Sequence, residues 1–81
     1  MSGFNTRVEY RGLAYNVQTQ DKGLGSPYVE SLIYRAGQLL ASRRTFYAAF
    51  LSAPDLAERV ERMVENQHKS ILEEILEGRF S

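Results

Sequence analysis

Side chains alternate in character along residues 4–19, and this alternation constrains the fold more than any other feature of the sequence. In residues 4–10 an apolar, aromatic or β-branched side chain occupies every second position, with polar side chains between. The alternation resumes over residues 13–19, after Arg11 and Gly12. A period of two is typical of a strand with one buried face, and a glycine in a short connection favours a tight turn. The sequence therefore predicts a β-hairpin.

The register of this hairpin follows from a two-residue turn. The turn pairs four residues of each strand on one face: Tyr10 with Leu13, Val8 with Tyr15, Thr6 with Val17 and Phe4 with Thr19. The opposite face then carries polar pairs such as Arg7 with Asn16. A shift of one residue would mix the two faces and lose the burial of the apolar one, so we expect the register above.

A second hairpin is predicted further along the chain. A loop at residues 20–27 precedes it. Its two strands lie at residues 28–34 and 39–46, and its turn lies at residues 36–37. The simple register places Ile33 opposite Leu40, and both faces are then partly apolar. Two explanations stay open: strands that are covered on both faces, or a β-bulge near Gly37 that shifts the register.

The spacing of apolar residues changes to that of an amphipathic helix after residue 52. Ser52 is a suitable N-cap, Pro54 fits the first turn, and Gly78 is a stop signal. One stripe recurs every three or four positions: Leu56, Val60, Met63, Val64, Gln67, Ile71 and Ile75. A helix over residues 54–77 is about 36 Å long. We expect it to extend beyond strands of roughly five to seven residues.

Residues 45–51 connect the two patterns. Their periodicity leaves open the end of a strand, a short helical turn, or both in succession. Phe46, Phe50 and Leu51 are expected in the core in each case.

The predicted fold class is α+β: a four-stranded antiparallel β-meander packed by a long C-terminal α-helix. We expect a single domain over residues 1–81, because a chain of 81 residues can bury one modest core. The meander and connector occupy residues 1–51 and the helix occupies residues 52–81.

Two segments, FNTRVEYRGLAYNVQTQDKG and YVESLIYRAGQLLASRRTFY, together cover half of the chain. They resemble a recurrent pattern of small bacterial proteins of unassigned function. The resemblance is carried by Tyr10, Gly12, Tyr15, residues 17–19 and residues 41–44. It implies a bacterial protein and no particular activity.

The composition bears on several classes of function. Ten Lys and Arg residues balance ten Asp and Glu residues, so the chain has no general attraction for nucleic acid or an anionic membrane. Six basic and three acidic residues lie in residues 1–53, and four basic and seven acidic ones in residues 54–81. The absence of cysteine excludes disulfides and thiolate metal sites. Apolar runs are far shorter than the roughly 20 residues of a membrane span, and we expect a cytoplasmic protein.

No set of residues in the sequence points to catalysis. His68 is the only histidine, and we expect a solvated helix residue there, without partners for a metal site. Gly23 and Gly25 lie between two strands, whereas phosphate loops lead from a strand into a helix. Glu73 and Glu74 are neighbours on a helix, point in different directions and are expected to be solvated. We predict no catalytic, cofactor-binding or metal-binding residues, and hence no enzyme.

The second hairpin carries the candidate partner-binding residues: Arg35, Arg43, Arg44, Tyr28 and Tyr34. Tyrosines beside arginines can stack bases and contact phosphates, which makes single-stranded nucleic-acid binding the alternative hypothesis. In the simple register Glu30 faces Arg43, which weighs against it. The favoured hypothesis is a small non-catalytic module for protein interaction or self-association.

Four apolar residues near the C-terminus are the candidate contacts of a homodimer: Ile71, Leu72, Ile75 and Leu76. They follow the polar residues 66–70, and a helix longer than the sheet would leave them exposed in a monomer. The alternative is a kink within residues 66–70 that folds the last turns back onto the same domain.

Overall fold

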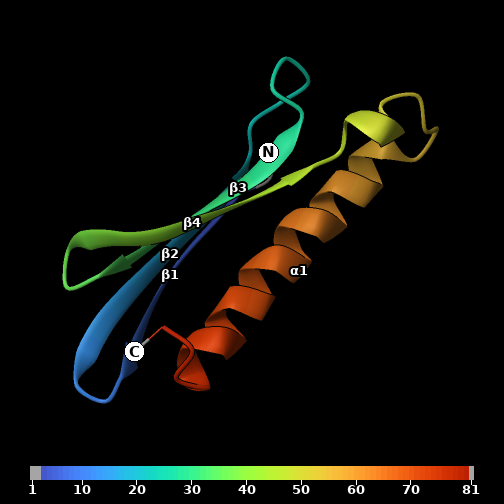
Figure 1. The fold of residues 1–81 in the computed structure, drawn as a ribbon. Helices are drawn as coiled ribbons and strands as arrows, with labels where there is room; N and C mark the ends of the chain where they lie inside the picture. Colours follow the sequence, from blue (N-terminus) through green and yellow to red (C-terminus); the bar gives the residue numbers. More distant parts are fainter. Residues whose placement is uncertain (1–2, 81) are drawn as a thin grey trace.

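The structure is a computed structural model that describes residues 3–80, so residues 1–2 and 81 of the expected domain lie outside the described residues. Figure 1 shows a twisted sheet with one long helix along one of its faces. The elements are β1 (Gly3–Tyr10), β2 (Leu13–Asp21), β3 (Tyr28–Arg35), β4 (Gln38–Phe46), η1 (Ala48–Phe50) and α1 (Leu56–Leu76). All neighbouring strands are antiparallel in the order β1-β2-β3-β4, which confirms the predicted α+β fold.

The register of β1 and β2 is the predicted one, pair by pair. The turn has positive φ at both central residues, 53° at Arg11 and 81° at Gly12. This conformation gives the connection the twist of the strands that it joins. The second hairpin uses the same turn, with φ of 51° at Ala36 and 81° at Gly37.

β3 and β4 pair with a shift of one residue near their turn. Tyr34 faces Leu39 as predicted, but Ile33 faces Ala41, so Leu40 is the extra residue of a β-bulge. The simple register, with Ile33 opposite Leu40, is therefore wrong, and the bulge is the explanation that the structure supports. Because one added residue reverses the alternation, apolar residues occur on both faces of β4.

α1 begins later than predicted. Its N-cap is Asp55 and its first residue is Leu56, whereas Ser52 and Pro54 precede it in non-helical turns. The Asp55 carboxylate makes no capping bond and instead accepts a 2.9 Å bond from Arg59 Nε. Successive tight turns, closed by the Ala53 N–H to Phe50 O bond and the Leu56 N–H to Ala53 O bond, displace the helix start.

The end of α1 matches the predicted stop signal. Gly78 has a φ of 81°, its N–H donates to Ile75 O, and the N–H of Arg79 donates to Glu74 O. This pair of bonds is a Schellman motif, which favours glycine because of the positive φ.

The length of α1 corrects the expectation of an overhang. Its 21 residues span about 32 Å, and the nine residues of β2 or of β4 span about 30 Å. The strands are longer than expected, so the helix and the sheet match. α1 also continues without interruption through residues 66–70, where a kink was the alternative.

The core lies between α1 and the inner face of the sheet, in two apolar clusters. One cluster is Tyr15, Val17, Ile33, Ile71 and Ile75, and the other is Val29, Tyr47, Val60 and Val64. Within residues 3–80 no helix is long and apolar enough to cross a membrane.

The connector after β4 is a strand end followed by a helical turn, the third of the possibilities above. The expectation that Phe46, Phe50 and Leu51 lie in the core is wrong, because they are 63%, 43% and 43% exposed. Tyr47 is the buried residue instead, and its hydroxyl donates to Asp21 Oδ1 at 2.6 Å. Burial, followed by this bond, raises the pKa of Tyr47 to about 12.

Candidate functional site

A layer of hydrogen-bonded side chains joins α1 to all four strands, at the height between the two apolar clusters. We call it the polar layer, and its members are Thr6, Thr19, Ser31, Thr45, Gln67 and His68. Each strand contributes one hydroxyl, and α1 contributes the amide and the imidazole. Buried polar groups are stable where their bonds are satisfied, and here the partners come from other elements of the fold.

His68 connects α1 to β1 and β2. Its Nε2 lies 2.8 Å from Thr6 Oγ1 and its Nδ1 lies 2.8 Å from Thr19 Oγ1. The ring stacks on Phe4 with centroids 5.3 Å apart. The expectation of a solvated histidine is wrong, because His68 is 5% exposed and lies one turn after Val64 on the inner face. Burial lowers the pKa of His68.

Gln67 connects α1 to β3 and β4. Its Nε2 donates to Ser31 Oγ at 2.9 Å and to Arg43 O at 3.2 Å. Its Oε1 accepts from Thr45 Oγ1 at 2.5 Å. Ser31 Oγ also lies 2.6 Å from Thr19 Oγ1, which joins this half of the layer to the half around His68.

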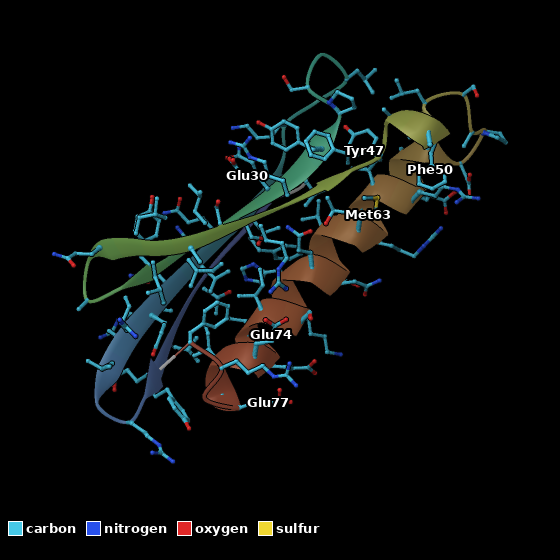
Figure 2. All side chains as sticks on the ribbon, in the orientation of Figure 1. Glu30, Tyr47, Phe50, Met63, Glu74 and Glu77 are labelled. Atoms are coloured by element: carbon cyan, nitrogen blue, oxygen red, sulfur yellow. The ribbon has the colours of Figure 1, made fainter. Side chains whose placement is uncertain are left out.

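The other face of β3 and β4 is the second candidate site. Val29, Ser31 and Ile33 are buried under α1, so the alternate residues of the strand point away from it. We call the outward set the open face, and it consists of Tyr28, Glu30, Leu32, Tyr34, Leu39, Ser42, Arg44 and Phe46. In Figure 2 Glu30 lies on the side of the sheet away from α1. No helix among the described residues covers this face.

Arg44 and Glu30 form an ion pair at the open face. Arg44 Nε lies 2.9 Å from Glu30 Oε2, and its guanidinium lies 5.0 Å from the centroid of the Tyr28 ring. That ring contacts Phe46 across the strands, with centroids 5.0 Å apart. The predicted pairing of Glu30 with Arg43 is wrong, because the bulge brings Arg44 opposite Glu30.

Two of the five candidate partner-binding residues lie on the inner side instead. Arg43 makes two bonds to the Glu74 carboxylate, at 2.9 and 2.7 Å, and Arg35 Nη1 donates to Phe80 O at 2.7 Å. The hydrogen bond with Arg43 lowers the pKa of Glu74 and raises that of Arg43. Glu74 is therefore paired with β4, contrary to the expectation of a solvated carboxylate. The structure leaves Arg44, Tyr28 and Tyr34 together on the open face.

The four candidate dimer contacts do not form one exposed patch. Ile71 and Ile75 are 0% and 1% exposed, and Leu72 packs against the same cluster. Leu76 alone is strongly exposed, at 55%. The premise that a monomer leaves this group uncovered is wrong, because the strands reach as far as the last turns of α1.

Neither the polar layer nor the bond from the buried Tyr47 hydroxyl to Asp21 was predicted from the sequence. Gln67 gave the one available signal, since it occupies a position of the apolar stripe. A polar residue at such a position needs partners inside the protein, and the hydroxyls of Thr6 and Thr19 lay on the predicted inner face of the first hairpin.

Possible ligand clusters and grooves can be located among the described residues. Within residues 3–80, no three His, Asp or Glu side chains lie close enough to hold a metal ion. A groove of about 310 Å³ lies beside β1 and β2, largely open to solvent, and it is lined by Gly3, Phe4, Asn5, Gln18, Thr19 and Gln20. Comparisons with protein-family models, with curated proteins and with solved structures found no match to this chain.

Proposed function

We propose that this protein is a non-catalytic self-association module, and that the open face of β3 and β4 binds the same face of a second copy. The observation that carries the proposal is the uncovered, largely apolar character of this face. Phe46 and Leu39 are 63% and 58% exposed at its two ends, where they face Tyr28 and Tyr34, and Leu32 lies between these ends. The Glu30–Arg44 pair and Ser42 lie among these apolar side chains. Exposed surface that combines aromatic and apolar side chains with a few polar groups is typical of interfaces.

The open face is complementary to itself. A two-fold axis parallel to the strands, between β3 and β4, places each residue of β3 over the β4 residue that it faces within one copy. Glu30 then lies over Arg44 of the second copy, and Arg44 over Glu30. Tyr28 meets Phe46 in the same way. The two sheets would pack with aligned strands, as in β-sandwiches.

The edges of the sheet are less suitable for self-association. β4 is an edge strand, but its bulge at Leu40 interrupts the ladder that a second strand would extend. On β1, the other edge, Arg7 and Glu9 form an exposed ion pair at 2.9 Å. Charged side chains on an edge disfavour strand pairing.

The nucleic-acid hypothesis has less support from the same geometry. Arg35 and Arg43 are held on the inner side, and Arg44 is neutralised by Glu30. A surface that binds phosphates needs an excess of positive charge, and the open face as defined carries one arginine and one glutamate. Lys22, beside this face, also approaches Glu30, at 3.9 Å. The cytoplasmic location expected from the sequence stays a prediction.

Sedimentation equilibrium of the full chain tests the proposal. At tens of micromolar we expect about twice the 9.2 kDa of one chain. Replacing Phe46 and Leu39 together by serine should give a folded monomer, because the dimer buries both apolar side chains and the substitution removes that burial. The matched control is Leu76→Ser, which removes an equally exposed leucine from α1 and should leave the dimer intact.

Three outcomes would count against the proposal. A wild-type mass of one chain over the whole concentration range excludes self-association. Loss of the dimer in Leu76→Ser with retention in the Phe46 and Leu39 variant assigns the interface to α1 instead. Binding of single-stranded DNA or RNA that weakens steeply with salt, by a wild-type monomer, supports the nucleic-acid alternative.

A further inference from the structure

The polar layer contains the only histidine of the chain, at the centre of the contact between α1 and the sheet. Both ring nitrogens are bonded to threonine hydroxyls, on β1 and on β2. A neutral imidazole donates from one nitrogen and accepts at the other, so the two hydroxyls must play opposite roles. The bonds of the rest of the layer decide which.

The direction of the hydrogen bonds follows from Gln67. Its Nε2 can only donate, so Ser31 Oγ accepts from it. Ser31 Oγ lies 2.6 Å from Thr19 Oγ1, and either oxygen can donate in that pair. In the arrangement that gives Ser31 and Thr19 one donated and one accepted bond each, Ser31 donates to Thr19 and Thr19 donates to His68 Nδ1. His68 then carries its hydrogen on Nε2 and donates it to Thr6 Oγ1.

Protonation of His68 breaks this order. Nδ1 becomes a donor, so Thr19 can no longer donate to it and must turn its hydrogen toward Ser31. Ser31 then receives hydrogens from both Thr19 and Gln67, and its own hydrogen loses its acceptor inside the layer. The cation would also be buried, since His68 is 5% exposed, and burial of an unpaired charge is unfavourable.

The side chains that contact the ring within residues 3–80 carry no negative charge to compensate the added proton. From β1 the ring meets Phe4 and Thr6, and from β2 it meets Thr19, none of which titrates near neutrality. The charged neighbours on its own helix, Glu65 and Lys69, are exposed.

The charged groups on the inner side of β3 and β4 are already paired. On β3, Arg35 donates to Phe80 O, and Ser31 belongs to the polar layer. On β4, Arg43 is bound to Glu74. A protonated His68 thus gains no carboxylate partner among the described residues.

We propose that His68 is an acid-sensitive latch that holds the edge strand β1 against α1 and releases it when the ring is protonated. Protonation leaves the Nε2–H bond to Thr6 in place, so release comes from hydration of the buried cation, which requires a strand to move away from the ring. β1 has a sheet neighbour on one side only, so its contact with α1 matters for its hold on the domain. Thr6 and Phe4 make the part of that contact nearest the N-terminus through the His68 ring, while Val8 and Tyr10 pack against the apolar cluster that holds Ile71 and Ile75. The latch concerns the inner side of the sheet and is independent of association through the open face.

The pH range follows from the direction of the pKa. Burial lowers the pKa of His68 in the folded chain below its ordinary value of 6.5, which the unfolded chain retains. The unfolded state therefore binds more protons between these two pKa values, and stability falls as the pH falls through this window. The effect is absent above 6.5 and levels off below the folded pKa. Within the window, one proton changes the unfolding equilibrium constant by at most about tenfold per pH unit.

Nuclear magnetic resonance of the wild-type chain tests the latch directly, because one histidine gives one set of ring signals. At neutral pH we expect the Nε2–H tautomer. On acidification we expect the ring signals of His68 to titrate with a midpoint below pH 6.5. The amide hydrogens of β1 should become less protected from hydrogen exchange over the same pH range, while the protection of the β3 amides stays unchanged. The Nδ1–H tautomer, or a midpoint at or above 6.5 with unchanged protection of β1, would overturn the proposal.

Two variants complete the test. His68→Gln retains a donor and an acceptor but cannot titrate here, so its β1 protection should change less between about pH 7.5 and about pH 5.5 than in the wild type. Glu65→Gln removes an exposed titratable neighbour and should keep the wild-type profile. Equal pH profiles for His68→Gln and the wild type would contradict the latch. If His68→Gln does not fold, the wild-type titration decides alone.

Discussion

Gln67→Met is the substitution whose effect can be derived most fully from the structure. Methionine has nearly the shape of glutamine but makes none of its strong hydrogen bonds. The change removes the bonds to Ser31 Oγ, to Arg43 O and from Thr45 Oγ1, at 2.9, 3.2 and 2.5 Å. Ser31 is fully buried and cannot replace its lost donor with bulk water, whereas the exposed Thr45 can.

The magnitude follows from these contacts. Each typical hydrogen bond contributes about 1 kcal/mol net, and the bond at 3.2 Å contributes less. The apolar methionine regains roughly 1 kcal/mol through easier transfer from water. We expect a net loss of about 1–2 kcal/mol in the free energy of unfolding. For a chain of this size, that lowers the thermal midpoint by roughly 4–16 °C.

Urea denaturation followed by circular dichroism measures this loss. Asn66→Met places the same side chain at the neighbouring exposed position and should change stability by less than about 0.5 kcal/mol. A Gln67→Met variant as stable as the wild type would refute the reasoning. It would mean that the polar layer contributes no more than an apolar filling of the same volume.

Three further predictions concern other parts of the fold. Val8→Lys should unfold or strongly destabilise the chain, because it brings a charge to the inner face. Arg7→Ala, on the outward and exposed side, should have a mild effect. Comparable urea midpoints for the two variants would show that the faces are reversed. Ala36→Asn should raise the free energy of unfolding by roughly 0.5–1 kcal/mol, and the thermal midpoint with it, because asparagine tolerates the φ of 51° better than alanine. A lower thermal midpoint would contradict a strained turn. Arg43 lowers the pKa of Glu74, so the wild type should exceed Glu74→Gln in free energy of unfolding by a constant amount above about pH 4.5. This difference should shrink as the pH falls further, and a difference that grows in acid would contradict the lowered pKa.

The first hairpin was predictable because its constraints are local. A two-residue turn with glycine fixes the register, and one polar and one apolar face leave a single way to bury the strands. The second hairpin lacked such a contrast between its faces. Its bulge places Arg43 and Thr45 on the side of α1, where they bond Glu74 and Gln67, and contacts between residues more than 20 positions apart leave no local pattern in the sequence.

The candidate sites were less predictable for the same reason. The sequence places Tyr28, Tyr34 and Arg44 in one hairpin, but which arginines share a face with them depends on the bulge. His68 lies in a polar stretch, and polar stretches of helices are usually solvated. Its burial becomes understandable once the threonines of two strands lie under the same turn of α1. The sequence contains the strand hydroxyls and the helix residues of the polar layer, but it does not show that they lie next to each other.

Charge reversal at the centre of the open face tests self-association most directly. Glu30→Arg gives a face with two arginines, and Arg44→Glu gives a face with two glutamates. We predict that each variant alone, folded by circular dichroism, sediments near the 9.2 kDa of one chain because like charges meet across the axis. An equimolar mixture should sediment near twice that mass, because each arginine then faces a glutamate. Single variants that remain dimers, or a mixture that remains monomeric, would contradict the account.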